Sequence, residues 1–266
     1  MAEQLPLWLQ DQCRRLTSTD EKVLNLNLNI RRVDNGAKMA ALVEALQLNS
    51  DIESLNLVTS LQSNEHAFRL FAAGILRNHC SLKSVFLSYN RLQNMVDVGT
   101  ALMTNSNLLV LDLDYNRIGP DGAAALASGL SVNQSLEKLS LSWNRIGDDG
   151  TIALAEALRS NQSLHALSLR RNDITNVGAD ALQKASKHST AIYHIDVENN
   201  FVCIKGAALL RILCQANRLG RRFVHDPSFS MALWPLVLQK AQSFPDVLYL
   251  WTLEQIEAVE GQPDKG

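Results

Sequence analysis

Aliphatic and polar positions follow one frame that returns along most of the chain. One copy of the frame consists of Leu136, Leu139, Leu141, Asn144, Ile146, Gly150, Leu154, Leu158 and Asn161. The preceding copy has matching residues at Leu108, Leu111, Leu113, Asn116, Ile118, Gly122, Leu126, Leu130 and Asn133. Asparagine recurs every 28 residues at Asn116, Asn144, Asn172 and Asn200. A fixed period of this length indicates a chain built by stacking one small structural unit.

Each unit predicts a short strand followed by a helix. The alternation in residues 139–142 is typical of a half-buried strand whose leucines point inward. In residues 149–158, Asp149 is placed to cap a helix, and Asn161 is expected to end it in the left-handed conformation that Asn tolerates. Stacked strands need about 4.8 Å each and helices about 8–10 Å. The sequence therefore predicts an α/β fold, a right-handed, horseshoe-shaped solenoid with parallel strands on the concave face and helices on the convex face.

The repeat frame divides the chain into three segments. Seven units cover residues 23–219, and they begin at Val23, Ile52, Leu82, Leu108, Leu136, Leu164 and Ile192. Residues 1–22 contain an amphipathic stretch, Leu7 to Leu16, that is expected to form a helical cap. Residues 220–266 break the period and are interpreted as a C-terminal helical cap or extension. That extension either covers the last coil or binds a partner, and the sequence leaves both readings open.

The pattern LxxLxLxxNxI, with its glycine-containing turn and LxxxL helix, resembles the ribonuclease-inhibitor-like class of leucine-rich repeats. This resemblance implies a horseshoe that binds another protein. Arg31 and Ser60 stand at the asparagine position of the first two units. The structural asparagine ladder is therefore expected to comprise Asn90, Asn116, Asn144, Asn172 and Asn200. In the sixth unit, Ser186 and Ser189 replace the helix leucine and the final asparagine, which predicts a looser convex surface there.

Composition narrows the function classes. The chain has 266 residues, 46% hydrophobic content and a formal net charge of −2, which argues against a nucleic-acid partner bound by phosphate neutralisation. No window approaches 18 apolar residues and the start lacks a basic leader, so neither membrane contact nor secretion is expected. The four cysteines form no CxxC pair. They are expected to be buried thiols in a reducing, cytoplasmic compartment.

Catalytic motifs are missing from the sequence. It contains no GxxxxGK[ST], HExxH or GxSxG. His194 shares a predicted strand face with Asp196 and Glu198, which is the one arrangement with metal or acid–base potential. Alternating polar residues on a solvated strand are nevertheless the default. The sequence predicts no enzyme activity, no catalytic residue, no metal site and no cofactor.

The candidate binding residues recur from coil to coil. Tyr89, Tyr115, Trp143 and Arg171 stand just before the ladder asparagines, and Arg91, Arg117 and Arg145 stand just after them. Such columns repeat about every 5 Å, and aromatic residues and Arg are enriched at binding hot spots. The strands add Phe86, Asp112, Asp114, Arg170, His194, Asp196 and Glu198 to this predicted surface on the concave face and rim.

Alternative interpretations are open for these columns. Repeats of the class resembled often carry Tyr or Trp before the asparagine for packing. The Arg side chains can be solvated charges offset by Asp114, Asp121 or Asp148. A functional Arg column would favour a carboxylate-bearing partner.

The leading hypothesis is a non-enzymatic protein–protein interaction module whose partner and oligomeric state the sequence does not indicate. One alternative is a GTPase-activating protein, because an activator of a nuclear-transport GTPase has similar repeats. Arg170 or Arg171 would then stabilise phosphate charge. A further alternative is the recognition arm of a sensor resembling NOD-like receptors.

Overall fold

The computed structural model of the chain describes residues 5–18, 22–28, 35–61, 64–77, 79–189 and 191–218. Arg31 and the predicted C-terminal extension, residues 220–266, lie outside the described residues. The predicted division into segments of residues 1–22, 23–219 and 220–266 stays a prediction.

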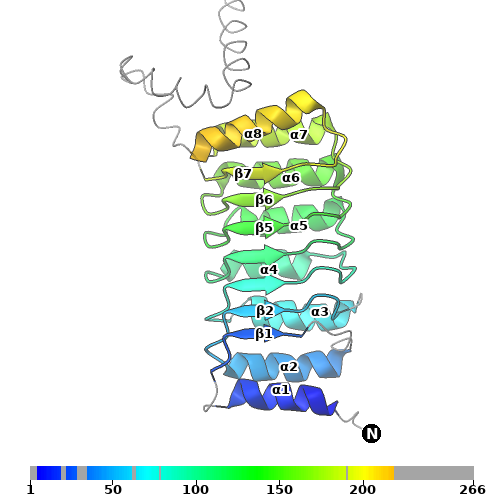
Figure 1. The fold of residues 1–266 in the computed structure, drawn as a ribbon, viewed down its shortest axis with the longest axis vertical. Coiled ribbons are helices and arrows are strands. Elements are labelled where there is room, and N and C mark those ends of the chain that lie inside the picture. Colours follow the sequence, from blue (N-terminus) through cyan, green and yellow to red (C-terminus); the bar gives the residue numbers. More distant parts are fainter. Residues whose placement is uncertain are drawn as a thin grey trace, which may run out of the picture. The chain divides into compact units, whose positions relative to one another are not determined.

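Seven short parallel strands form one sheet whose strand order is the chain order (Figure 1). The middle residue of every strand is aliphatic and buried, and each is in register with the next, as in Leu111, Leu139 and Leu167. The strands are β1 (Asn25–Asn27), β2 (Ser54–Asn56), β3 (Ser84–Phe86), β4 (Val110–Asp112), β5 (Lys138–Ser140), β6 (Ala166–Ser168) and β7 (His194–Asp196).

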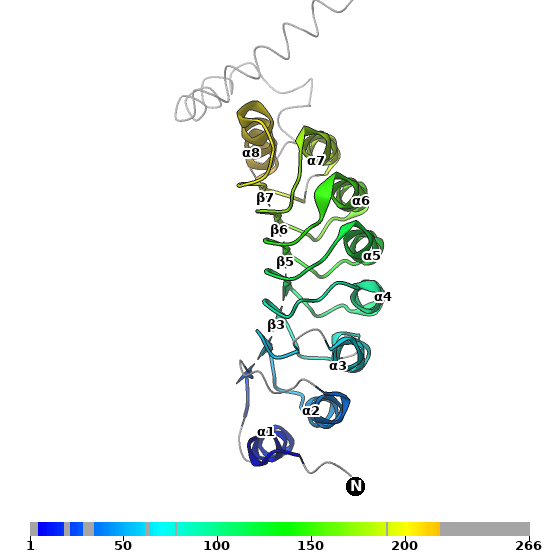
Figure 2. The ribbon, with the colours of Figure 1, turned by 90° about the vertical axis from the view of Figure 1, so that its right-hand side faces the viewer.

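A helix follows each strand, and from α1 to α7 each helix packs on the helical segment of the neighbouring coil. Figure 2 shows strands on one side of the array and helices α2 to α7 on the other. One continuous aliphatic core lies between the two layers. The helices are α1 (Leu7–Thr17), α2 (Gly36–Leu48), α3 (Glu65–Phe71), the π-helix η1 (Ala72–Leu76), α4 (Val96–Thr104), α5 (Pro120–Leu130), α6 (Gly147–Ser160), α7 (Asn176–His188) and α8 (Ile204–Arg218). The predicted fold class, an α/β solenoid of parallel strands and helices, is confirmed.

The ladder asparagines hold neighbouring coils together. Asn144 Nδ2 donates to the carbonyl oxygens of Leu113 at 3.0 Å and Leu141 at 2.9 Å, and its Oδ1 accepts from the backbone nitrogen of Ile118 at 3.0 Å. Asn90, Asn116, Asn172 and Asn200 make corresponding bonds. Each amide thus satisfies backbone groups of two coils that water does not reach.

A second row of asparagines follows the helices, and its role differs from the prediction. Asn161 has φ −72° and ψ 130°, so the predicted left-handed cap is wrong. Its Nδ2 donates to the carbonyl oxygens of Leu130 at 2.7 Å and Asn133 at 2.8 Å, and its Oδ1 accepts from the Leu164 nitrogen. Equivalent bonds are made by Asn49, Asn105 and Asn133. The chain is therefore tied to the preceding coil on both sides of α4, α5 and α6.

Helix α6 begins at Gly147, before the position expected from the sequence. Ile146 is its N-cap residue, and no side chain caps it, so the predicted cap by Asp149 is wrong. Asp148 instead accepts bonds from the next coil. Its Oδ1 accepts hydrogen bonds from the backbone nitrogens of Thr175 at 2.8 Å and Gly178 at 2.9 Å. Its Oδ2 accepts one from the Thr175 hydroxyl at 2.6 Å.

The four cysteines were expected to be buried thiols, and the structure differs from this expectation in part. Cys214 is buried, but Cys80 and Cys203 are exposed, so the expectation of buried thiols is wrong for those two. Ser186 is fully buried, and its hydroxyl has no hydrogen-bond partner among the described residues. Within the described part of the chain, no helix is both long and apolar enough to span a bilayer.

Close helix packing predicts the effect of Gly129→Ala. A Cβ at Gly129 would lie 2.3 Å from the carbonyl oxygen of Gly99, a backbone atom that cannot turn away. We expect this clash between α4 and α5 to lower the free energy of unfolding by about 1–3 kcal/mol, despite the better helix propensity of Ala. Gly119→Ala is the control, because a Cβ there meets nothing within 4 Å. Urea denaturation measures both, and equal stability of the two variants would contradict the packing argument.

The ladder predicts a loss of stability in Asn144→Ala. The substitution leaves the Leu113 and Leu141 carbonyls and the Ile118 nitrogen without their side-chain partner. Each unsatisfied buried group costs about 1–3 kcal/mol. We expect the thermal midpoint to fall well below that of the control Gln134→Ala, whose side chain is exposed. An unchanged midpoint would show that the amide does not stabilise the stack.

Candidate functional site

The candidate site lies in the loops that leave the carboxyl ends of the central strands. Tyr89, Tyr115, Trp143 and Arg171 each have a positive φ, between 52° and 61°. Their backbone nitrogens donate to the next coil, as in Tyr115 to the Ser142 carbonyl at 2.8 Å and Trp143 to the Arg170 carbonyl at 2.7 Å. These bonds fix the left-handed conformation at equivalent positions of successive loops.

The three aromatic rings form one stack, called here the aromatic column: Tyr89, Tyr115 and Trp143. The ring centroids of Tyr89 and Tyr115 are 4.1 Å apart with 10° between the planes, and those of Tyr115 and Trp143 are 4.8 Å apart with 17°. The Arg171 guanidinium covers the other face of Trp143 at 4.1 Å from the centroid. Tyr89 is 50% exposed and Trp143 40%, so the column packs against itself while its edges face solvent.

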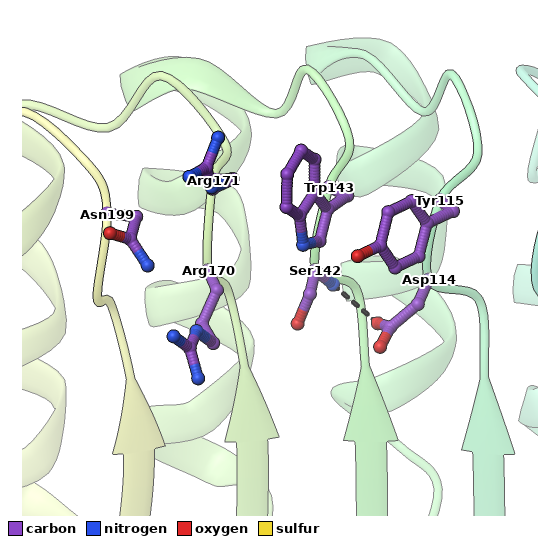
Figure 3. Close-up of a pocket in the computed structure, with 7 residues that line it drawn as sticks. All are labelled: Asp114, Tyr115, Ser142, Trp143, Arg170, Arg171 and Asn199. Carbon is purple, nitrogen blue, oxygen red and sulfur yellow. Dashed lines mark hydrogen bonds between the residues drawn. The ribbon is translucent and has the colours of Figure 1, made fainter.

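A cavity of about 400 Å³ lies beside the aromatic column. It is lined by Asp114, Tyr115, Ser142, Trp143, Arg170, Arg171 and Asn199. Figure 3 shows Trp143 between Tyr115 and Arg171, with Asp114, Ser142 and Arg170 closer to the strand ends. The cavity therefore has aromatic, cationic and anionic groups within one concave site.

Asp114 is the half-buried carboxylate of the cavity. Its Oδ1 accepts hydrogen bonds from the Ser140 hydroxyl and the Ser142 backbone nitrogen, both at 2.6 Å. Burial raises the pKa of the Asp114 carboxyl, and the neighbouring Asp112 raises it further, while the serine hydrogen bonds oppose the shift. The carboxylate is thus held in place but is costly to ionise.

Arg170 is tied to the acidic end of the strand face. Its Nε lies 3.8 Å from Asp196 Oδ2, and its Nη2 lies 3.1 Å from Glu198 Oε2. The structure therefore brings three predicted residues together as an ion-pair network. His194 is the first residue of β7, the strand that ends at Asp196, and its side chain is exposed. It belongs to no group of three potential metal ligands among the described residues.

The rim arginines are Arg91, Arg117 and Arg145, and their positive charges have no ion-pair partner among the described residues. All three side chains are exposed. Asp114 and Asp148 are hydrogen-bonded to serine, threonine and backbone groups instead. Neither carboxylate forms an ion pair with the Arg column, and the alternative that Asp114, Asp121 or Asp148 offsets these charges stays a prediction.

The remaining predicted residues lie on the strand face. Phe86 pairs with Asp112 in the register of β3 and β4, and Asp112 Oδ2 accepts from the Ser88 hydroxyl at 2.7 Å. Neither residue lines the cavity. Sequence reasoning missed Ser142 and Asn199, although Asn199 stands 28 residues after Arg171 in the same column of the frame.

Comparison with known families matches three segments of the chain. Residues 104–127, 132–155 and 160–182 match the family described as Leucine Rich repeat. These three segments are similar to leucine-rich repeats. The matched segments contain Tyr115, Trp143 and Arg171, so most of the column stands on recognised repeats.

Three solved structures are among those similar to this chain. The actin-binding site 2 of leiomodin-1 has 15% identity and a TM-score of 0.42, covering 90% of this chain and 99% of that one. The tropomodulin C-terminal domain of Caenorhabditis elegans has 13% identity and a TM-score of 0.39, covering 80% and 95%. An internalin of Listeria monocytogenes has 17% identity and a TM-score of 0.36, covering 70% and 64%. No curated protein sequence matches the chain. At these identities the likeness does not extend to function.

The raised pKa predicts a pH-dependent effect of Asp114→Asn. A carboxyl with a raised folded pKa stabilises the fold while protonated, and that stability is lost as the pH rises from the ordinary aspartate range through the raised value. Asn removes this loss and can still accept the Ser142 bond. We expect the stability of Asp114→Asn relative to the wild type to increase from acidic to neutral pH, measured by urea midpoints. The exposed Asp149→Asn is the charge control, and a difference that stays constant with pH would contradict the prediction.

Proposed function

We propose that this chain is a non-enzymatic protein-interaction module that binds a polypeptide partner across the aromatic column and the strand face. The observation that carries the proposal is the ordered stack of Tyr89, Tyr115, Trp143 and Arg171 beside a cavity of about 400 Å³. Aromatic and Arg side chains dominate binding hot spots, particularly where a neighbouring pocket can exclude water.

The rigidity of the column supports a binding role. Each stacked aromatic pair contributes about 0.5–1.5 kcal/mol, and the cation–π contact about 0.5–1 kcal/mol at an exposed site. These contacts hold the side chains in place before a partner arrives. A surface that is already ordered loses less conformational entropy when it binds.

The mixture of charges supports a protein partner rather than a uniform polyanion. Asp112 is the last residue of β4 and Asp114 follows it by two residues, whereas Arg170 with Asp196 and Glu198 lies toward the last strand. Alternating charge along one face provides register and specificity with a folded partner. Solenoids of this kind, including the ribonuclease-inhibitor-like class that the repeat pattern resembles, provide extended concave surfaces for such contacts.

The geometry gives less support to the GTPase-activating alternative. Arg170 is engaged by two carboxylates, Asp196 and Glu198. An arginine that stabilises phosphoryl transfer has to reach the developing charge on a nucleotide. Release of Arg170 would leave Asp196 and Glu198 uncompensated.

The proposal predicts that Tyr115→Ala/Trp143→Ala abolishes partner binding. Removal of both rings opens the cavity wall and leaves Arg171 without its stacking partner. We expect recovery of specific partners in quantitative affinity capture to fall by about tenfold or more. Circular dichroism should show a folded variant with cooperative melting.

Tyr193→Ala is the matched control, because this exposed tyrosine contacts His165 and lies outside the cavity. Partner recovery that is equal in the wild type and both variants would overturn the proposal. Loss of folding in the double variant alone would assign the column to packing and would equally overturn it.

A further inference from the structure

Four consecutive repeats present an arginine that lacks a carboxylate partner. Arg91, Arg117, Arg145 and Arg171 form no ion pair with any residue that the structure describes. Some other arginines do, since Arg170 contacts Asp196 and Glu198, and Arg159 contacts Glu156. Arginines without an ion pair thus recur at consecutive turns of the rim, in a chain whose formal net charge is −2.

Two carboxylates near the rim, Asp114 and Asp148, are committed to other groups. Asp148 accepts three hydrogen bonds from Thr175 and Gly178, and Asp114 accepts from Ser140 and Ser142. Neighbouring guanidinium groups at about 5 Å repel each other by about 0.8 kcal/mol in water. An external anion would relieve this repulsion, and a guanidinium pairs with a carboxylate through two parallel hydrogen bonds.

The cavity has opposite charges at its two ends. Arg170 and Arg171 line one end and Asp114 the other, as Figure 3 shows. They belong to repeats two strands apart, which corresponds to about 10 Å. Asp114 Oδ1 accepts from the Ser140 hydroxyl and the Ser142 backbone nitrogen. A carboxylate has about four lone-pair sites, so it can accept from a further donor. The cavity therefore suits an anionic group near Arg171 and a hydrogen-bond donor near Asp114.

We propose that the partner is an acidic polypeptide segment that lies along the rim. One of its carboxylates pairs with Arg171 at the cavity, and further carboxylates pair with Arg145, Arg117 and Arg91. A donor of the same segment, a backbone N–H or a hydroxyl, bonds to Asp114. This inference rests on the proposed function and specifies the chemistry of its partner.

A polypeptide fits this surface better than a nucleic acid does. Asp112, Asp114, Asp196 and Glu198 lie on the strand face next to the rim. A nucleic acid carries a negative charge at every nucleotide, so its phosphates would be repelled by these carboxylates. A polypeptide can place carboxylates at the arginines and uncharged residues elsewhere.

The test is the binding of a short fluorescein-labelled polyglutamate peptide to the full chain, followed by fluorescence anisotropy at low and physiological salt. The variants are Arg171→Gln and the triple variant Arg91→Gln/Arg117→Gln/Arg145→Gln. Arg159→Gln on α6 is the charge-matched control, because Arg159 lies on the helix layer. Circular dichroism confirms that each variant is folded.

We expect binding that weakens as salt rises. Arg171→Gln should raise the dissociation constant by about tenfold. Each rim arginine removed should contribute about a twofold to fivefold increase. Arg159→Gln should bind as the wild type does, because Arg159 lies on α6 in the helix layer.

Two results would overturn the inference. One is polyglutamate binding that is absent, or that falls equally in Arg159→Gln and in the rim variants. The other is tighter and equally rim-dependent binding of single-stranded oligothymidylate, which would assign the surface to nucleic acid. If captured partners depend on Tyr115 and Trp143 while polyglutamate does not bind, the acidic partner is wrong and the interaction module stands. If polyglutamate binds through the rim but capture is unaffected by the aromatic substitutions, the module as proposed fails instead.

Discussion

A buried asparagine amide at each turn from strand to helix is the interaction on which the rest of the structure depends. In a stack of coils, the turn leaves backbone donors and acceptors that face a neighbouring coil and not water. Asn144 satisfies such groups of its own coil and of the preceding one. Because the bonds bridge coils, they fix the coils in one register. The rings of Tyr115 and Trp143 then stack at 4.8 Å, the distance that parallel strands set.

The residue before each ladder asparagine is held in the left-handed region. That conformation costs about 1–2 kcal/mol for a residue with a Cβ, and glycine would avoid the cost. Thr59 and Asn199 share it with Tyr115 and Trp143, so the backbone conformation belongs to the repeat and not to a particular site. What distinguishes the central repeats is the side chain that each turn presents. Aromatic rings at three consecutive turns make contacts that Thr59 or Asn199 cannot make.

The sequence predicted the features that follow from the repeat period alone, namely the strand register and the alignment of equivalent side chains. Equal spacing of Leu111, Leu139 and Leu167 was sufficient to predict a parallel register, and the same spacing placed Tyr115 over Trp143. Contacts between coils at unequal positions could not be predicted in this way. The pattern predicted that Asn161 caps its own helix, yet its side chain bonds to the preceding coil. Asp148 accepts hydrogen bonds from the start of the helix in the following coil. Of two adjacent arginines, Arg170 meets carboxylates and Arg171 does not, a difference that depends on side-chain direction.

The two ends of the aromatic column differ chemically, and this difference gives the surface a direction. At one end the guanidinium of Arg171 covers Trp143, so a cation closes the stack beside the cavity. At the other end, the next turn carries Thr59, whose side chain has no ring to extend the stack from Tyr89. Tyr89 accordingly keeps half of its surface exposed. A proposed partner that places an anion at Arg171 and an apolar group at Tyr89 satisfies both ends, whereas the reversed partner leaves the guanidinium without an anion and a ring face in water. On the proposed function, the column would select orientation as well as composition, because stacking has fixed the order of its side chains along the repeat axis.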